Sequence, residues 1–159
     1  MKTASVAELK KELSNISPKE LKELCLRLVK YKKENKELLT YLLFEANDEE
    51  SYIRDIKEET DELFADINSN NLYWAKKSLR KILRIINKYT KYSGNKQTEV
   101  ELLLYYCRKL KDSGISFKYN ATLLALYERQ LVKAEKALAK LHEDLQYDYA
   151  NEIEELKLV

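Results

Sequence analysis

The chain has 159 residues, of which 45% are hydrophobic and 35% are charged, and its formal net charge is +2. This composition excludes intrinsic disorder and fits one domain with a real core, while the net charge is too small to indicate a partner. Only two Gly and one Pro occur. Because sheet-rich folds need many tight turns, this shortage predicts long helices joined by short loops.

The first two predicted helices carry narrow apolar stripes. The first covers about 5–14, and its stripe is Val6, Leu9 and Leu13. The second begins at Ser17, where Pro18 suits the first helical position and Glu20 completes a capping box. Its stripe is Leu21, Leu24, Leu28 and Tyr31.

The third predicted helix, at 37–46, is short and apolar over much of its circumference. Its apolar residues are Leu38, Leu39, Leu42, Leu43 and Ala46. A helix that is hydrophobic on most sides is typical of a buried position. We therefore expect this helix to be central in the fold.

Cap and turn residues place the later helices. Helices are predicted at about 49–68, after Asn47-Asp48, and at about 72–92, after Asn70-Asn71. Another covers about 97–112, between two Gly-containing breaks, and the last begins near Asn120. Short loops make neighbouring helices antiparallel. The sequence thus predicts an all-α fold of six to eight antiparallel helices in a single domain, 1–159, as a bundle or a short α-α superhelix of stacked helical hairpins.

The last predicted helix carries a heptad pattern. Apolar residues spaced three and four apart are Leu124, Tyr127, Leu131, Ala134, Leu138, Leu141 and Leu145. A continuous helix over 120–156 would be about 55 Å long, longer than the others. We expect either an overhanging end or a separate terminal helix at 148–158, capped by Asp148 or Asn151.

An overhanging end predicts a homodimer seam. The seam residues would be Leu138, Leu141, Leu145, Tyr149, Ile153 and Leu156. The alternative is that they pack on helices of the same chain.

Charge is sorted along the chain more sharply than its small total suggests. The segment 48–66 contains nine acidic and two basic residues, a net charge of −7, whereas 67–98 contains eight basic residues and no acidic one. In one interpretation, the two segments are antiparallel neighbours whose charges compensate each other. In the other, the basic helix binds phosphates of a nucleic acid.

The nucleic-acid interpretation assigns a set of basic residues on the helix at 72–92. These candidate binding residues are Lys77, Arg80, Lys81, Arg84, Lys88 and Lys91. Aromatic residues near the helix ends would stack on bases, and they are Tyr73, Trp74, Tyr89 and Tyr92. The adjacent acidic segment argues against this interpretation, because it would repel the same backbone. A membrane-surface role is disfavoured, because the apolar face of this helix is needed for the core.

Catalytic patterns are scarce. The one histidine, His142, cannot supply the paired ligands of a helical metal site, and two isolated glycines cannot form a phosphate loop. We predict no catalytic residue, no metal and no cofactor.

Glu59-x-x-Glu62 resembles the first half of the magnesium motif of all-helical nucleotide pyrophosphohydrolases. That family has a second acidic pair on a following helix, which the acid-free stretch after Asp66 does not provide. The resemblance implies, as a further alternative, a magnesium-dependent hydrolase centred on Glu58, Glu59 and Glu62.

The leading hypothesis is a non-enzymatic helical protein–protein interaction module that binds a partner protein or itself. The N-terminus has no apolar run, and no uncharged apolar stretch approaches the ~20 residues of a spanning helix, so we expect no membrane segment. Cys25 and Cys107 lie in apolar helical runs and are expected to be buried free thiols of a cytoplasmic protein.

Overall fold

The structure is a computed structural model that describes residues 1–158, and it confirms the all-α prediction: these residues contain eight α-helices and no strand. The helices are α1 (Val6–Leu13), α2 (Pro18–Tyr31), α3 (Lys33–Thr40), α4 (Glu49–Ala65), α5 (Leu72–Ser93), α6 (Lys96–Asp112), α7 (Ala121–Leu138) and α8 (Glu143–Lys157). A π-helical turn, η1, covers Tyr41–Glu45, and a 3₁₀ turn, η2, covers Phe117–Tyr119.

Short polar side chains begin most of these helices. Ser17 and Glu20 form the predicted capping box of α2, and Ser5 and Glu8 form another at α1. The predicted Asp48 cap accepts a hydrogen bond from the amide of Ser51. Side-chain oxygens of asparagine cap α5, α6 and α7; these are Asn71, Asn95 and Asn120. Each such cap satisfies amides that the first helical turn leaves without a partner.

The internal contacts divide the chain into two compact units, Met1–Phe44 and Glu45–Val159. The prediction of one domain over 1–159 stays a prediction.

The N-terminal unit contains α1, α2 and α3 and has almost no core. No side chain between residues 1 and 40 is buried, and Tyr41 is 6% exposed. Leu38, Leu42 and Leu43 are exposed by 37%, 54% and 60%, so the expected central position of the helix at 37–46 is wrong. Within the unit Met1–Phe44, no other element buries these apolar side chains.

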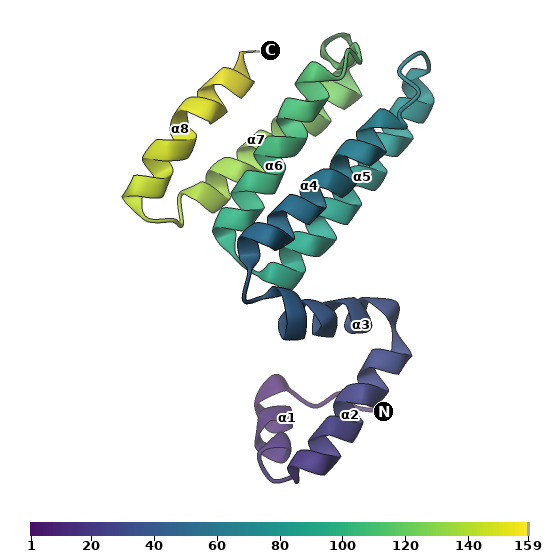
Figure 1. Cartoon of the computed structure of the whole chain (residues 1–159), viewed down its shortest axis with the longest axis vertical. Helices are drawn as coiled ribbons and strands as arrows, with labels where there is room; N and C mark the ends of the chain where they lie inside the picture. Colours follow the sequence, from purple (N-terminus) through teal and green to yellow (C-terminus); the bar gives the residue numbers. More distant parts are fainter. Residues whose placement is uncertain (159) are drawn as a thin grey trace. The chain divides into compact units, whose positions relative to one another are not determined.

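The central helix is α6, in the second unit. Its consecutive residues Leu102, Leu103 and Leu104 are all at most 1% exposed, so neighbours cover α6 on several sides. Helices α4, α5 and α7 lie beside it, and α8 packs on α6 and α7 (Figure 1). The second unit is therefore a helical bundle built around α6.

The heptad pattern does not form one long helix. The helix α7 ends at Leu138, and α8 begins at Glu143, earlier than the predicted terminal helix at 148–158. Its cap is His142, whose ring nitrogen accepts a weak hydrogen bond from the amide of Asp144, rather than Asp148 or Asn151. The break allows α8 to turn back and pack on the bundle. Within residues 1–158, no helix is both long enough and apolar enough to cross a membrane.

Candidate functional site

A groove of about 620 Å³ lies between α5 and α7 and is lined by basic side chains. The lining residues are Tyr73, Lys76, Lys77, Arg80, Leu83, Arg84, Asn87 and Leu126. Four of these carry a positive charge and none carries a carboxylate. We call this feature the basic groove.

The amphipathic pattern of α5 produces the basic groove. One face of the helix is fully buried, and its members Ala75, Leu79, Ile82 and Ile86 are at most 1% exposed. This burial fixes the rotation of the helix, so that Lys77, Arg80 and Arg84 are exposed to solvent. Leu83 and Leu126 are nearly buried and give the groove an apolar part.

The cations of the basic groove have no anionic partner within the described residues. No carboxylate of residues 1–158 lies within 4 Å of the charged nitrogens of Lys76, Lys77, Arg80 or Arg84. Lys133 of α7 is different, because its Nζ lies 3.2 Å from Glu99 and also donates to Asn87. The groove thus keeps its positive charge, whereas the charge of Lys133, next to Asn87, is neutralised by Glu99.

Two exposed aromatic rings lie at the start of α5. Tyr73 and Trp74 are 71% and 50% exposed, and their rings meet edge to face with 5.4 Å between centroids. The Nζ of Lys77 lies 5.1 Å from the centroid of the Trp74 ring. Exposed rings next to unpaired cations form a surface that suits a ligand with both anionic and planar groups.

The structure brings together only half of the predicted nucleic-acid-binding residues. Lys77, Arg80 and Arg84 line the basic groove, whereas Lys81 and Lys91 are exposed outside its lining. Lys88 is half-buried, with its Nζ 4.9 Å from the centroid of the Tyr89 ring. The prediction omitted Lys76, although Lys76, Arg80 and Arg84 follow each other at intervals of four residues. Residues four apart lie on the same side of a helix, so this spacing already placed Lys76 beside Arg80 and Arg84.

The acidic helix α4 makes ion pairs with α6. Asp61 Oδ1 lies 3.0 Å from Lys109 Nζ, and Lys57 Nζ lies 2.5 Å from Glu101. Burial alone would raise the pKa of Asp61, but the hydrogen bonds from Tyr105 and Lys109 and the charge of Lys109 lower it below its usual value. These pairs join α4 to α6, while the basic helix α5 also packs beside α4, as the compensation interpretation expects of the two segments.

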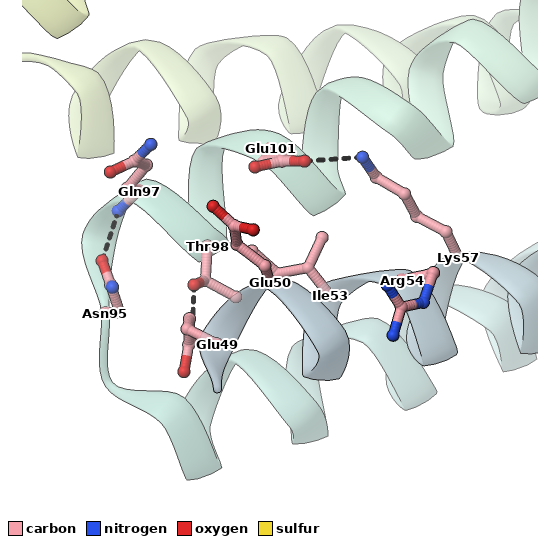
Figure 2. Close-up of a pocket in the computed structure, with 9 residues that line it drawn as sticks. All are labelled: Glu49, Glu50, Ile53, Arg54, Lys57, Asn95, Gln97, Thr98 and Glu101. Carbon is pink, nitrogen blue, oxygen red and sulfur yellow. Dashed lines mark hydrogen bonds and ion pairs between the residues drawn. The ribbon is translucent and has the colours of Figure 1, made fainter. Parts of the chain in front are cut away.

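A second cavity, of about 520 Å³, lies between α4 and the start of α6 (Figure 2). Its carboxylates include Glu49, which accepts a 2.5 Å hydrogen bond from the Thr98 hydroxyl, and Glu101, which pairs with Lys57. These contacts join α4 to α6. Among residues 1–158, no three Asp, Glu, His or Cys side chains are grouped so that they could hold a metal ion. Of the hydrolase candidates, Glu58 and Glu62 are exposed and Glu59 is half-exposed on α4.

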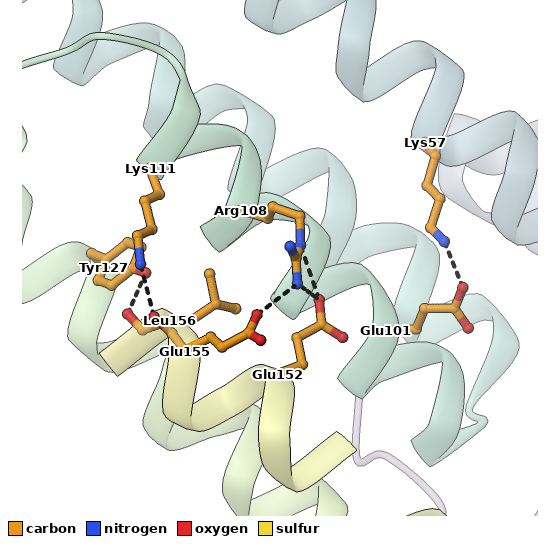
Figure 3. A network of polar contacts seen from close by, with 8 residues as sticks. All are labelled: Lys57, Glu101, Arg108, Lys111, Tyr127, Glu152, Glu155 and Leu156. Carbon is orange, nitrogen blue, oxygen red and sulfur yellow. Dashed lines mark hydrogen bonds and ion pairs between the residues drawn. The ribbon is translucent and has the colours of Figure 1, made fainter. Parts of the chain in front are cut away.

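The predicted homodimer seam lies partly inside this chain. Leu138, Ile153 and Leu156 are buried, whereas Leu141, Leu145 and Tyr149 are half-buried. Polar contacts from α6 and α7 hold α8 in place (Figure 3). Arg108 binds Glu152 at 2.8 Å, Lys111 donates to the carbonyl oxygen of Glu155 at 2.7 Å, and the Tyr127 hydroxyl donates to the carbonyl oxygen of Leu156 at 2.7 Å. A second copy would reach only the half-buried residues.

Comparisons with known proteins give no relative from which a function could be transferred: no family model, no curated protein and no solved structure matches the chain.

Proposed function

We propose that the chain is a non-enzymatic helical interaction module that self-associates through the apolar face of α1 and α2. This face, the N-terminal apolar face, consists of Val6, Leu9, Leu13, Leu21, Leu24 and Leu28. The observation that carries the proposal is that these side chains remain between 40% and 83% exposed in a unit that buries no side chain before Tyr41. A second copy supplies the missing apolar layer.

The size of the N-terminal unit supports this proposal. Helical units of about 40 residues usually need disulfides, a metal or oligomerisation, because they cannot bury enough apolar surface alone. The unit covers Met1–Phe44, and its one cysteine, Cys25, is a free thiol. Association with a second copy is one way to cover its leucines.

A rough energy balance indicates how strong the association is. Covering the six exposed side chains on each of two copies, at roughly 1 kcal/mol each, gives about 12 kcal/mol. Association itself costs roughly 4–15 kcal/mol in lost freedom of motion. The net gain is then at most about 8 kcal/mol, which corresponds to a micromolar or weaker dimer that depends on concentration.

The polar surroundings of the face fit a second copy of the same chain. Charges of both signs alternate beside the apolar stripe of α2, where Lys19, Glu20, Lys22 and Glu23 follow one another. An antiparallel pair of α2 helices would place acidic residues of one copy near basic residues of the other. A surface of a single sign would repel its own copy.

Light scattering coupled to size-exclusion chromatography tests the proposal on the full chain. The wild type should change from monomer to dimer mass between about 5 and 500 µM, the range expected for weak association. Leu24→Glu/Leu28→Glu places two charges on the face and should give a monomer throughout. The matched control, Lys136→Gln/Lys140→Gln, makes the same change in net charge at exposed residues of the second unit and should dimerise like the wild type.

Two results would overturn this function. A wild-type monomer at every concentration would remove self-association altogether. A dimer that persists in Leu24→Glu/Leu28→Glu would show that another surface forms it; Leu145→Glu would then test the half-exposed part of the predicted C-terminal seam. Circular dichroism of each variant shows whether α4–α8 remain folded.

A further inference from the structure

We propose that the basic groove between α5 and α7 binds single-stranded nucleic acid. Phosphates would bind Lys76, Lys77, Arg80 and Arg84, and a base would stack on Tyr73. This inference is independent of self-association, because it rests on the second unit and on different side chains.

The cations of the basic groove have no carboxylate partner within residues 1–158. Lys76, Arg80 and Arg84 lie one helical turn apart on the same helix, where like charges repel each other. The chain has 27 acidic residues that could have neutralised them, yet none lies within ion-pair distance in residues 1–158. An anionic ligand that enters the groove removes this repulsion. The arrangement therefore lowers the stability of the free protein and favours binding of an anion.

The basic surface of α5 is longer than the groove itself. From Lys76 to Lys91 the helix advances about 22 Å at 1.5 Å per residue. Exposed Lys81 and Lys91 continue the positive surface beyond the groove. A single phosphate would reach one turn of this helix, whereas a linear polyanion can follow all of it and release several counterions.

The burial of the apolar face of α5 favours a nucleic acid over a membrane surface as the ligand. A helix that binds a membrane surface inserts its apolar face among the lipids. The apolar face of α5 is not available, because Leu79, Ile82 and Ile86 are at most 1% exposed in the bundle core. Only its basic side and its exposed aromatic end can meet a ligand.

The exposed tyrosine ring of the groove favours a single strand over a duplex. In a duplex the faces of the bases are stacked on each other and cannot be reached by a protein ring. In a single strand they are open, and stacking on an aromatic side chain tolerates any base. Tyr73 lines the groove, is 71% exposed, and lies next to the cations that would hold the adjacent phosphates. The ligand is therefore a single strand bound without strong sequence preference.

Fluorescence anisotropy with a fluorescein-labelled 20-mer of oligothymidylate tests this proposal on the full chain. Four phosphate contacts predict that log K falls with log salt with a slope of about −3. Lys77→Gln/Arg80→Gln/Arg84→Gln removes three of these contacts. It should weaken binding about 100-fold at 0.1 M salt and reduce the slope to about −1.

Two matched variants control for general charge and for general aromatic loss. Lys118→Gln/Lys136→Gln/Lys140→Gln removes three exposed lysines outside the groove and should change affinity less than threefold. Tyr73→Ala should weaken binding about tenfold. Tyr147→Ala removes an equally exposed ring on α8 and should have no effect.

Several outcomes would overturn the proposal. They are the absence of wild-type binding at 20 mM salt, equal losses for the two triple variants, and binding to vesicles containing phosphatidylserine without binding to the oligonucleotide. Equal affinity for a 20-base-pair duplex, together with an unaffected Tyr73→Ala variant, would refute the single strand as ligand. Circular dichroism excludes unfolding as the cause of any loss.

Discussion

The hydroxyl of Tyr105 donates a hydrogen bond to the carboxylate of Asp61, with 2.6 Å between Oη and Oδ1. Lys109 approaches the same oxygen to 3.0 Å. Burial and the neighbouring carboxylate raise the pKa of Tyr105 to about 12, so its hydroxyl remains a donor at neutral pH. These contacts join α4 to α6 and give the acidic helix partners inside the bundle.

The Asp61 contacts predict a specific loss of stability in acid. The pKa of Asp61 is lowered in the folded protein, so its contribution to stability is present above the unfolded pKa, about 3.9, and is lost as the pH falls through the lower folded value. Asp61→Asn should cost about 1 kcal/mol at pH 7 and little at pH 2.5. Urea unfolding followed by circular dichroism between pH 2.5 and 7 measures this.

The matched control for the acid prediction is Asp55→Asn, which changes an exposed carboxylate of the same helix. It should leave the dependence of the unfolding free energy on pH close to that of the wild type. Identical pH profiles for Asp61→Asn and Asp55→Asn would contradict the assigned role of Asp61.

The attachment of α8 depends on a buried tyrosine. Tyr127 is fully buried, its hydroxyl donates to the carbonyl oxygen of Leu156, and burial raises its pKa above the usual value. Tyr127→Phe leaves that carbonyl with one partner fewer, so we expect a loss of about 1–2 kcal/mol in the free energy of unfolding. Hydrogen exchange should become faster in α8 before it does in α6.

Tyr147→Phe serves as the control for Tyr127→Phe, because Tyr147 is on α8 but 77% exposed. Tyr147→Phe should leave both the free energy of unfolding and the rate of hydrogen exchange in α8 unchanged. Uniformly faster exchange throughout the bundle in Tyr127→Phe would show that the hydroxyl supports the whole core rather than the attachment of α8.

The unpaired cations of the basic groove predict that removing them does not lower the free energy of unfolding. Because Lys77, Arg80 and Arg84 repel one another, Lys77→Gln/Arg80→Gln/Arg84→Gln should be as stable as the wild type or up to about 1 kcal/mol more stable at low salt. The difference should vanish at 0.5 M salt. Thermal unfolding at both salt concentrations checks this, and destabilisation by the triple substitution would show that the cations support the fold.

Capping residues in the sequence predict where most helices begin. The elements that were predicted wrongly depend on packing between residues far apart in the chain. Pro18, Glu20 and the asparagine caps act within one turn, so the sequence alone locates them. The break between Leu138 and Glu143 has neither Gly nor Pro, and it forms where α8 turns back to pack on α6 and α7. The apolar residues at 37–46 were misjudged because composition does not reveal whether another layer covers them.

The candidate site was predictable in part for the same reason. The acid-free segment 67–98 and the helical spacing of its cations identify α5 and its basic side from the sequence. The groove also needs Leu126 of α7, which is 43 residues after Leu83. Likewise, the ion pairs between α4 and α6 follow from the arrangement of the bundle, and no pattern along the chain predicts them.

The two free thiols differ in their surroundings and so predict selective alkylation. Cys107 is 0% exposed, and burial raises the pKa of its thiol well above the usual range, which suppresses the reactive thiolate. Cys25 is only half-buried, on α2. Mass spectrometry after iodoacetamide treatment of the native protein should find one modification, at Cys25, and a second only in denaturant.

The alkylation rate also reports on the N-terminal apolar face. Cys25 directly follows Leu24 on α2, so a second copy that covers this face should slow its reaction as protein concentration rises. Cys107→Ser should keep the single rapid modification, and Cys25→Ser should show none in the native state. Rapid labelling of native Cys25→Ser would mean that Cys107 is accessible, which its burial in α6 contradicts. A Cys25 rate independent of concentration from 5 to 500 µM, roughly the range of weak association, would argue against pairing through this face.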